Sequence, residues 1–205
     1  IVFAFNRPDA LQSMLSSLKC NPEAKDSDLF IFVDGPRKNK EGEEEMVRRV
    51  HEVVKNTTGF KTIQYNFSDA NIGLGPSIIA GVSKIIDEYG KAIVIEDDLK
   101  LSSNFLAFMN DGLERYIDEN KVFSICGYSN KVKGPKGYTA DSYFCTRSSS
   151  WGWATWKDRW DSVDWELSDW SRVEANAAAF NKWGGSDCFS MLKGWHDGRN
   201  KSWAI

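Results

Sequence analysis

Histidine and cysteine, the usual ligands of zinc, are both scarce in this sequence. Its 205 residues include two histidines, His51 and His196, and four cysteines with no Cys-x-x-Cys spacing. Two separated histidines and widely spaced cysteines argue against a zinc site and against a secreted disulfide scaffold. We therefore expect buried, reduced thiols of the kind found in cytosolic proteins, while a bridge between Cys126 and Cys145 stays open.

The sequence also lacks a long apolar run and an excess of positive charge. It has no stretch of about 20 apolar residues, so it predicts no membrane-spanning helix. Acidic residues outnumber basic ones, 29 against 26, whereas a nucleic-acid-binding protein carries a basic face. We therefore expect neither a transmembrane segment nor a nucleic-acid partner.

What the sequence does contain is an alternation of strand and helix patterns through residue 98. Strands are predicted at residues 1–5, 29–33, 63–67 and 92–95, and helices at residues 8–18, 40–55 and 75–89. This alternation predicts an α/β fold with a mostly parallel central sheet and helices on both faces. Within the second helix, Glu41 to Glu45 fall in the first turns and His51 in the middle, and we expect both to be solvent-exposed.

The most informative segment is Ile93-Val94-Ile95-Glu96-Asp97-Asp98, where a buried strand pattern runs directly into three carboxylates. Ligands of open α/β sheets bind outside the carboxyl ends of the strands. Adjacent carboxylates repel one another unless a cation balances them. Mg²⁺ and Mn²⁺ prefer carboxylate oxygens and often share them with substrate phosphates. The segment therefore predicts a metal–diphosphate site, with a solvated acidic turn as the alternative.

Four motifs, in sequence order, resemble those of GT-A glycosyltransferases, in the branch of the N-acetylglucosaminyltransferase I family and bacterial sugar transferases. They are the first strand with its Asn6-Arg7-Pro8 turn, Asp34 after the second strand, Asn71-Ile72-Gly73-Leu74-Gly75, and Glu96-Asp97-Asp98, which is similar to an Asp-x-Asp motif. The resemblance implies a Rossmann-like GT-A fold. It also implies a bacterial, cytoplasmic, metal-dependent enzyme of surface polysaccharide synthesis, whose membrane association stays open. Such an enzyme moves a sugar from a UDP-sugar to a saccharide acceptor.

The resemblance also implies roles for individual residues at this site. Asp98 would contact the metal, Mn²⁺ or Mg²⁺, and Asp97 or Glu96 would reach the donor's ribose or the metal's water shell. Asp34 would recognise the base, uracil, through its N3–H, unless it is only a turn residue. Further nucleotide-sugar contacts are expected from Phe5, Arg7, Asn71, Gly73 and Gly75.

Arg7 and the glycines also have ordinary explanations. Arg7 follows the first strand, where its guanidinium would hold a phosphate or orient Asp34, or would simply be a surface arginine. Gly73 and Gly75 permit close approach of the backbone to a nucleotide, or they punctuate a loop. No Gly-Lys-Ser/Thr follows them, which excludes an ATP-binding P-loop.

All nine tryptophans lie between residues 151 and 203. Indole rings stack on the apolar C–H faces of sugars, and the run Trp-Gly-Trp-Ala-Thr-Trp resembles a segment of bacterial members of the same branch. We expect Trp151, Trp153 and Trp156 to line the acceptor side. An aromatic subcore is the alternative.

The sequence offers two candidates for the catalytic base. An inverting transfer needs a carboxylate that deprotonates the acceptor hydroxyl. Asp197 is the first candidate, and Asp187, expected mainly to cap the following helix, is the second.

We expect one domain, residues 1–205, truncated at its C-terminus, with a donor half at 1–126 and an acceptor half at 127–205. An inactive carbohydrate- or nucleotide-binding domain and a nucleotidyl or phosphoryl transferase are the alternatives.

Overall fold

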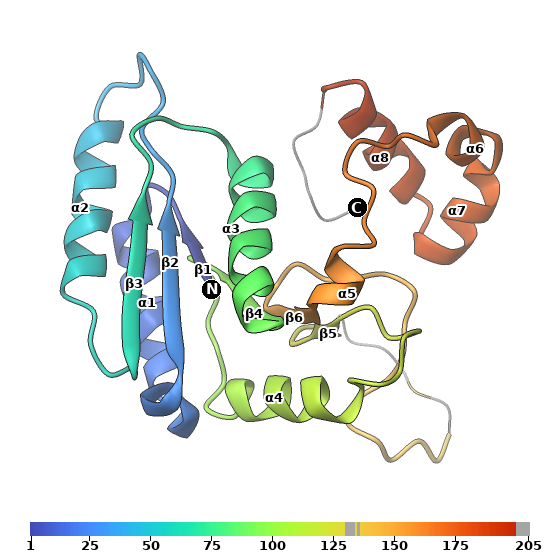
Figure 1. Ribbon diagram of the computed structural model, residues 1–205, viewed down its shortest axis with the longest axis horizontal. Helices are drawn as coiled ribbons and strands as arrows, with labels where there is room; N and C mark the ends of the chain where they lie inside the picture. The colour runs from blue at the N-terminus through green and yellow to red at the C-terminus, as the bar shows by residue number, and fades with distance from the viewer. Residues whose placement is uncertain (130–133, 135, 200–205) are drawn as a thin grey trace.

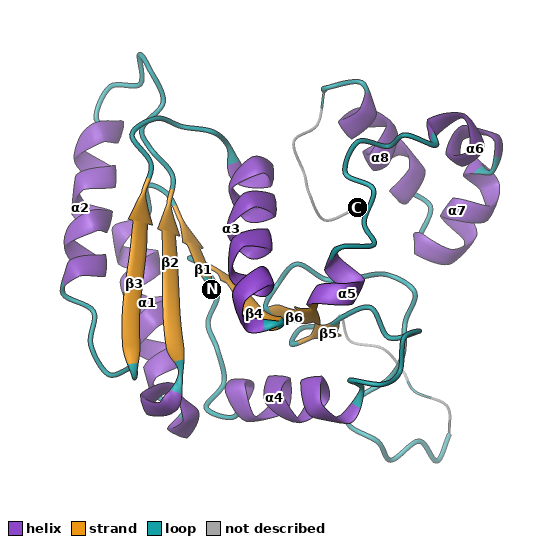
Figure 2. Ribbon diagram, viewed as in Figure 1, coloured by secondary structure: helices purple, strands orange, loops and turns teal. Residues whose placement is uncertain are grey.

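The chain forms one mixed β-sheet with helices packed on both of its faces (Figures 1 and 2). The computed structural model describes residues 1–129, 134 and 136–199, so the chain end at residues 200–205 lies outside the described part. The strands are β1 Val2–Ala4, β2 Asp28–Val33, β3 Thr62–Phe67, β4 Lys91–Glu96, β5 Ile125–Cys126 and β6 Trp153–Trp156. They lie in the order β3-β2-β1-β4-β6-β5.

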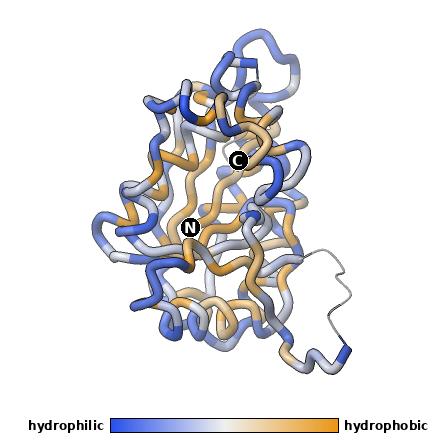
Figure 3. Tube along the Cα trace, turned by 90° about the vertical axis from the view of Figure 1, so that its right-hand side faces the viewer, coloured by the Kyte–Doolittle hydropathy of each residue, from blue (hydrophilic) through white to orange (hydrophobic). Residues whose placement is uncertain are grey.

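The helices up to residue 160 pack against the sheet, whereas the later helices form a separate group (Figure 1). They are α1 Pro8–Lys19, η1 Pro22–Asp26, α2 Glu43–Lys55, α3 Leu74–Tyr89, α4 Phe105–Arg115, α5 Lys157–Trp160, α6 Trp170–Ala175, α7 Ala177–Gly184 and α8 Cys188–His196. One buried cluster contains side chains of α1, α2 and α4, and a second contains side chains of α3 and α5. Figure 3 shows apolar residues along the interior strands and hydrophilic residues at the periphery. The predicted α/β fold with helices on both faces is confirmed.

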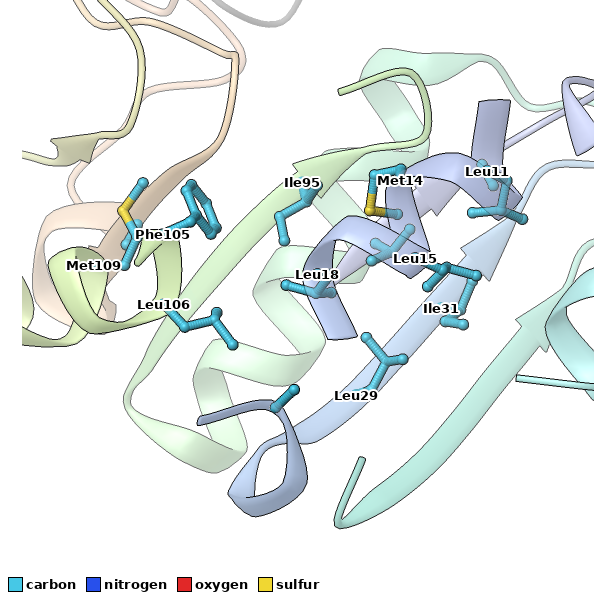
Figure 4. Close-up of a cluster of buried hydrophobic side chains, with 14 of the residues drawn as sticks. Leu11, Met14, Leu15, Leu18, Leu29, Ile31, Ile95, Phe105, Leu106 and Met109 are labelled. Atoms are coloured by element: carbon cyan, nitrogen blue, oxygen red, sulfur yellow. The ribbon is translucent and has the colours of Figure 1, made fainter. Parts of the chain in front are cut away.

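Helix α1 illustrates how the sequence pattern produces this packing. Leu11, Met14, Leu15 and Leu18 recur at intervals of three and four residues, so they share one face of the helix. All four are buried. Figure 4 shows them beside Leu29 and Ile31 of β2 and Ile95 of β4, which belong to the same cluster. Pro8 opens the helix at its first turn, where a missing N–H costs nothing.

The sheet contains a switch point between β1 and β4. Strand β1 pairs in parallel with β2 on one side and with β4 on the other. Chain connections therefore leave β1 and β4 in opposite directions along the sheet, and ligands of such folds bind outside the carboxyl ends of these strands. The residues that follow them are Phe5 to Arg7 and Asp97 to Asp98. The predicted meeting of these segments at one rim is confirmed.

Strand β6, which the sequence pattern did not predict, corrects the expected role of two tryptophans. It pairs antiparallel with β4, with Trp153 opposite Val94 and Trp156 opposite Lys91. Trp153 and Trp156 are each only 3% exposed. Trp156 Nε1 donates a hydrogen bond to the backbone oxygen of Leu113 at 3.1 Å. Trp156 belongs to the cluster under α1 and α4, and Trp153 to the cluster under α3, where its ring stacks on Trp160. Both residues are therefore part of the buried core and do not line an acceptor site.

The four cysteines differ from expectation in their burial. All four cysteines are free, so Cys126 and Cys145 form no bridge. Only Cys188 is buried, whereas Cys20 and Cys145 are exposed, which corrects the expectation of buried thiols. In the part of the chain that the structure describes, no helix has the length and apolar character needed to cross a membrane.

Candidate functional site

Arg7 connects two of the three acids that end β4. Its Nη2 forms an ion pair with Asp97 Oδ1, and its Nη1 donates to Asp98 Oδ2 at 2.6 Å. Asp97 is 2% exposed, and its other oxygen accepts a hydrogen bond from the backbone N–H of Phe5 at 3.3 Å. Asp97 therefore fastens the exit of β1 to the exit of β4. Asp98, with 46% of its side chain exposed, is the accessible acid of the pair.

The acids at this rim have perturbed proton affinities. Burial, reinforced by the charges of Asp98 and Asp97, raises the pKa of Glu96 to about 7. Burial also raises the pKa of Asp97, although Arg7 opposes this shift. Burial is the largest cause of both shifts, and a cation bound at the rim would lower both pKa values by favouring the ionised carboxylates.

The donor set fits one class of metal site. No group of three or more His, Cys, Asp or Glu side chains converges within the described residues. Mg²⁺ bound with nucleotides is held by one or two carboxylates together with substrate phosphates and water, not by an all-protein cage. Asp98 supplies a hard, exposed oxygen for such a site, and the guanidinium of Arg7 shows that this carboxylate already binds a cation.

Asp34 holds the loop that precedes α3. Its Oδ1 accepts from the backbone N–H groups of Gly35 and Ile72, at 3.0 and 2.9 Å. Its Oδ2 accepts from Asn71 Nδ2 and from the backbone N–H of Gly73, both at 2.9 Å. A carboxylate offers about four acceptor sites, so this pattern leaves none for the N3–H of uracil. The expectation that Asp34 reads the base, and that Arg7 orients it, is therefore corrected: Asp34 positions the loop.

The loop that Asp34 holds leads into the first turn of α3. Gly73 has φ +89°, a conformation that glycine adopts without strain, and the space beside its Cα is open. Asn71 donates a second hydrogen bond to Gly35 O at 3.0 Å, and Gly75 is buried in the first turn of the helix. The first N–H groups of a helix have no intrahelical acceptor and favour anions. The geometry of these three residues is thus compatible with their expected place beside a nucleotide.

Replacing Asp34 by alanine should destabilise the protein. It would leave the N–H groups of Ile72 and Gly73 without their acceptor, at an expected loss of about 2–4 kcal/mol of unfolding free energy. Chemical denaturation checks this, with the exposed Asp69→Ala as the matched control. UDP and pyrophosphate should lose affinity together, because the loop itself is displaced. A loss confined to UDP would restore base recognition to Asp34.

Glu43 is a site residue that sequence reasoning missed. The expectation of a solvated acidic run holds for Glu44 and Glu45, but Glu43 is buried. It accepts hydrogen bonds from the backbone N–H of Arg37 at 2.7 Å, from the Arg37 guanidinium, and from Asn6 Nδ2 at 3.2 Å. Glu43 therefore joins the exits of β1 and β2 to the start of α2. Its partners are not neighbours in a helical pattern, so no local signal marks it.

Glu43 should stabilise the folded protein near neutral pH and lose this contribution at acid pH. Hydrogen bonds from the Arg37 side chain lower the pKa of Glu43 from 4.5 to about 2. A carboxyl whose pKa is lowered by folding stabilises the folded state above its unfolded pKa, and this contribution disappears as the pH falls towards the folded value. Glu43→Gln should therefore flatten the fall in stability between pH 4.5 and about 2. Urea denaturation over this pH range measures it, with exposed Glu44→Gln as control; an unchanged slope would contradict the assignment.

Trp151 and Tyr128 stand at the same edge of the sheet as the acids. Strand β6 runs antiparallel to β4 and begins opposite Val94, so the segment before it, which contains Trp151, lies at the end of the sheet where β4 ends. Trp151 is 52% exposed, and its ring lies 4.5 Å from that of Tyr128 at a tilt of 54°. Trp151 could be predicted from its position in a tryptophan run, whereas no sequence signal marks Tyr128.

Gly152 and its neighbours fix this aromatic pair. The N–H of Gly127 donates to Gly152 O at 2.7 Å and ties the end of β5 to the start of β6. Gly152 has φ +71°, and a Cβ there would lie 2.9 Å from the ring of Phe105. Only glycine suits both constraints, so the close turn keeps Trp151 at the rim.

The two candidate bases are paired with basic side chains away from the rim. Asp187 occupies the N-cap position of α8 but makes no capping hydrogen bond, contrary to expectation; Arg147 binds both of its oxygens, at 2.7 and 3.0 Å. Asp197 accepts from Arg199 at 2.7 Å and contacts His196 Nδ1 at 3.1 Å. Hydrogen bonds from Arg147 lower the pKa of Asp187, and those from Arg199 and His196 lower the pKa of Asp197. A lowered pKa makes a carboxylate a weaker proton acceptor.

Comparison with solved structures shows a distant similarity of fold. The sequence matches no protein-family model and no curated protein. Among solved structures, the fold is similar to that of the mannosyltransferase PcManGT from Pyrobaculum calidifontis, determined in complex with GDP-Man and Mn²⁺. The TM-score is 0.44 with 11% sequence identity, over 77% of this chain and 44% of that one. The chain thus spans less than half of that protein's length.

Proposed function

We propose that this chain is a metal-dependent glycosyltransferase that moves a sugar from a nucleotide-diphospho-sugar, a UDP-sugar, to a saccharide acceptor. The observation that supports the proposal most is the composition of the rim at the switch point between β1 and β4. An exposed carboxylate, Asp98, and a guanidinium, Arg7, meet there, at the edge of the sheet where the parallel strand β2 also ends. This combination suits a divalent cation and a diphosphate together.

Each residue of the rim has a place in this proposal. Asp98 would hold Mn²⁺ or Mg²⁺, whose chemistry is to neutralise the charge that develops on the leaving diphosphate. Asp97 fixes Arg7 beside that position, and Glu96 lies next to both. Further nucleotide-sugar contacts are proposed for a set of neighbours: Phe5, Asn71, Gly73 and Gly75.

The acceptor is proposed to bind over Trp151 and Tyr128. Their exposed rings offer a rigid apolar surface for the C–H face of a hexose or N-acetylhexosamine. The reaction is proposed to be inverting, with Asp197, or else Asp187, as the base. The proposed setting is the synthesis of a surface polysaccharide in the bacterial cytoplasm.

One observation favours a second candidate function, a nucleotide-sugar-binding domain without catalysis. Asp197 and Asp187 are both paired with cations and have lowered pKa values. If neither is released when an acceptor binds, the rim would bind a donor and transfer nothing.

Calorimetric titration of UDP with and without Mn²⁺ tests the proposal, with GDP in parallel to test the base. We expect UDP to bind in the presence of Mn²⁺ and to bind much more weakly in its absence. Binding that is indifferent to Mn²⁺, or no binding in either condition, would overturn the metal–diphosphate assignment. Assaying sugar release and transfer from UDP-sugars then separates the enzyme from the inactive binding domain.

A further inference from the structure

Arg7 makes two ion pairs of different kinds. Its Nη2 binds Asp97, which is 2% exposed, and its Nη1 binds Asp98, which is 46% exposed. A buried carboxylate that loses its partner is strongly destabilising, whereas an exposed pair is worth little. Breaking the ion pair with Asp97 therefore costs more free energy than breaking the ion pair with Asp98.

The backbone of Arg7 is fixed while its side chain is accessible. Arg7 is the N-cap residue of α1, and its carbonyl oxygen accepts from the N–H of Leu11 at 3.0 Å. The following residue, Pro8, restricts the backbone further. Half of the Arg7 side chain, 49%, is exposed. The guanidinium can therefore turn about its contact with Asp97 without any movement of the chain.

We propose that Arg7 is an internal counter-ion that competes with the metal for Asp98. In the structure, Nη1 of Arg7 lies 2.6 Å from Asp98 Oδ2 and neutralises it. A divalent cation on Asp98 repels the guanidinium, so Nη1 leaves Asp98 while Nη2 stays on Asp97. The freed Nη1 then donates to an oxygen of the diphosphate that shares the metal. This inference rests on the proposed function and adds a dependence between its two ligands. The metal binds weakly when it is alone and tightly when a diphosphate binds with it.

The competition predicts effects of opposite sign for one substitution. Arg7→Gln removes the charge but retains an amide that donates to Asp97. We expect its affinity for Mn²⁺ alone to rise roughly three- to tenfold, because the competing charge is gone. Its affinity for UDP in saturating Mn²⁺ should fall by at least about tenfold, because a charge-assisted hydrogen bond to phosphate is lost. Titration of Mn²⁺ alone, followed by UDP in Mn²⁺, measures both.

Matched variants isolate the role of Asp98. Arg48→Gln removes an arginine that also bridges two carboxylates, Glu45 and Glu52, and is 58% exposed, and it should leave the affinity for Mn²⁺ alone unchanged. Adding Asp98→Asn to Arg7→Gln should cancel the gain in Mn²⁺ affinity, because the two substitutions act on the same oxygen. Thermal melts show which variants are folded. If Arg7→Gln is not folded, Arg7→Lys keeps the charge on Asp97 and should still raise the Mn²⁺ affinity.

The outcomes separate the inference from the proposed function. If Arg7→Gln, or Arg7→Lys in its place, binds Mn²⁺ alone more weakly than the parent or equally well, Arg7 is a brace or a bystander and the inference is overturned. That result leaves the proposed function intact as long as the parent binds UDP with Mn²⁺. If the parent does not bind UDP with Mn²⁺, the proposed function fails, yet a gain in Mn²⁺ affinity would still establish the competition.

Discussion

Replacing Asp98 with alanine is expected to lower Mn²⁺-dependent affinity for UDP by at least about 100-fold, since even residues that only support a metal ligand typically cost 10- to 100-fold. Asp98 is the exposed acid of the rim, and its ion-pair partner among the described residues is Arg7. It carries little packing, so the fold should persist. Without Asp98, Arg7 would remain on Asp97, and the rim would keep only the buried Asp97 and the half-buried Glu96.

Calorimetry of UDP in the presence and absence of Mn²⁺ measures this loss, and a thermal melt verifies the fold. Asp111→Ala, which removes an exposed acid from α4, is the matched control and should bind as the parent does. A variant at position 98 that binds UDP with Mn²⁺ normally would show that the metal lies elsewhere.

Replacing Asp197 with asparagine is expected to reduce sugar transfer by ~10²–10⁴-fold, the usual contribution of a general base. Affinity for UDP in Mn²⁺ should stay within a few-fold, because Asp197 pairs with His196 and Arg199 and not with the rim. Those pairs keep its pKa low. The prediction therefore requires acceptor binding to loosen them, so that the carboxylate can accept a proton.

Two companions make the Asp197 experiment decisive. Arg199→Gln breaks the ion pair but keeps the carboxylate, so it should retain transfer, whereas a purely structural role would make both variants equally poor. Asp187→Asn should be mild, because it breaks only the exposed pair with Arg147. Initial rates with a panel of UDP-sugars and saccharide acceptors measure all three. An essential Asp187 beside a dispensable Asp197 would exchange their roles.

The strands and helices of the first half could be predicted because each buries one face at a regular spacing. Leu11, Met14, Leu15 and Leu18 mark α1 in this way, and the strands that flank the rim follow the same principle. The rim itself was predictable too, since acids that directly follow a buried strand must lie at its carboxyl end. These predictions need only local periodicity and the geometry of parallel strands.

The remaining features depend on contacts between distant segments. Trp153 and Trp156 look like sugar-binding residues in the sequence, yet their strand lies inside the sheet and helices cover both of its faces. Arg7 had several acids within reach in principle, and only the fold shows that it binds Asp97 and Asp98 instead of Asp34. Glu43 is buried because Arg37 and Asn6 fold back onto it. No local pattern carries that information.

The pairing of β6 with β4 determines where the chain can be truncated for experiments. A fragment ending after Cys126 would contain all of the proposed metal ligands but would lack β6. Strand β4 would then present the backbone groups that now bond to residues 153–156 as a bare sheet edge, next to the apolar side chains of Ile93 and Val94. Exposed edges of this kind recruit other chains and aggregate. A shortened version meant for nucleotide binding should therefore retain the tryptophan-rich strand, even though that strand contributes no ligand to the nucleotide.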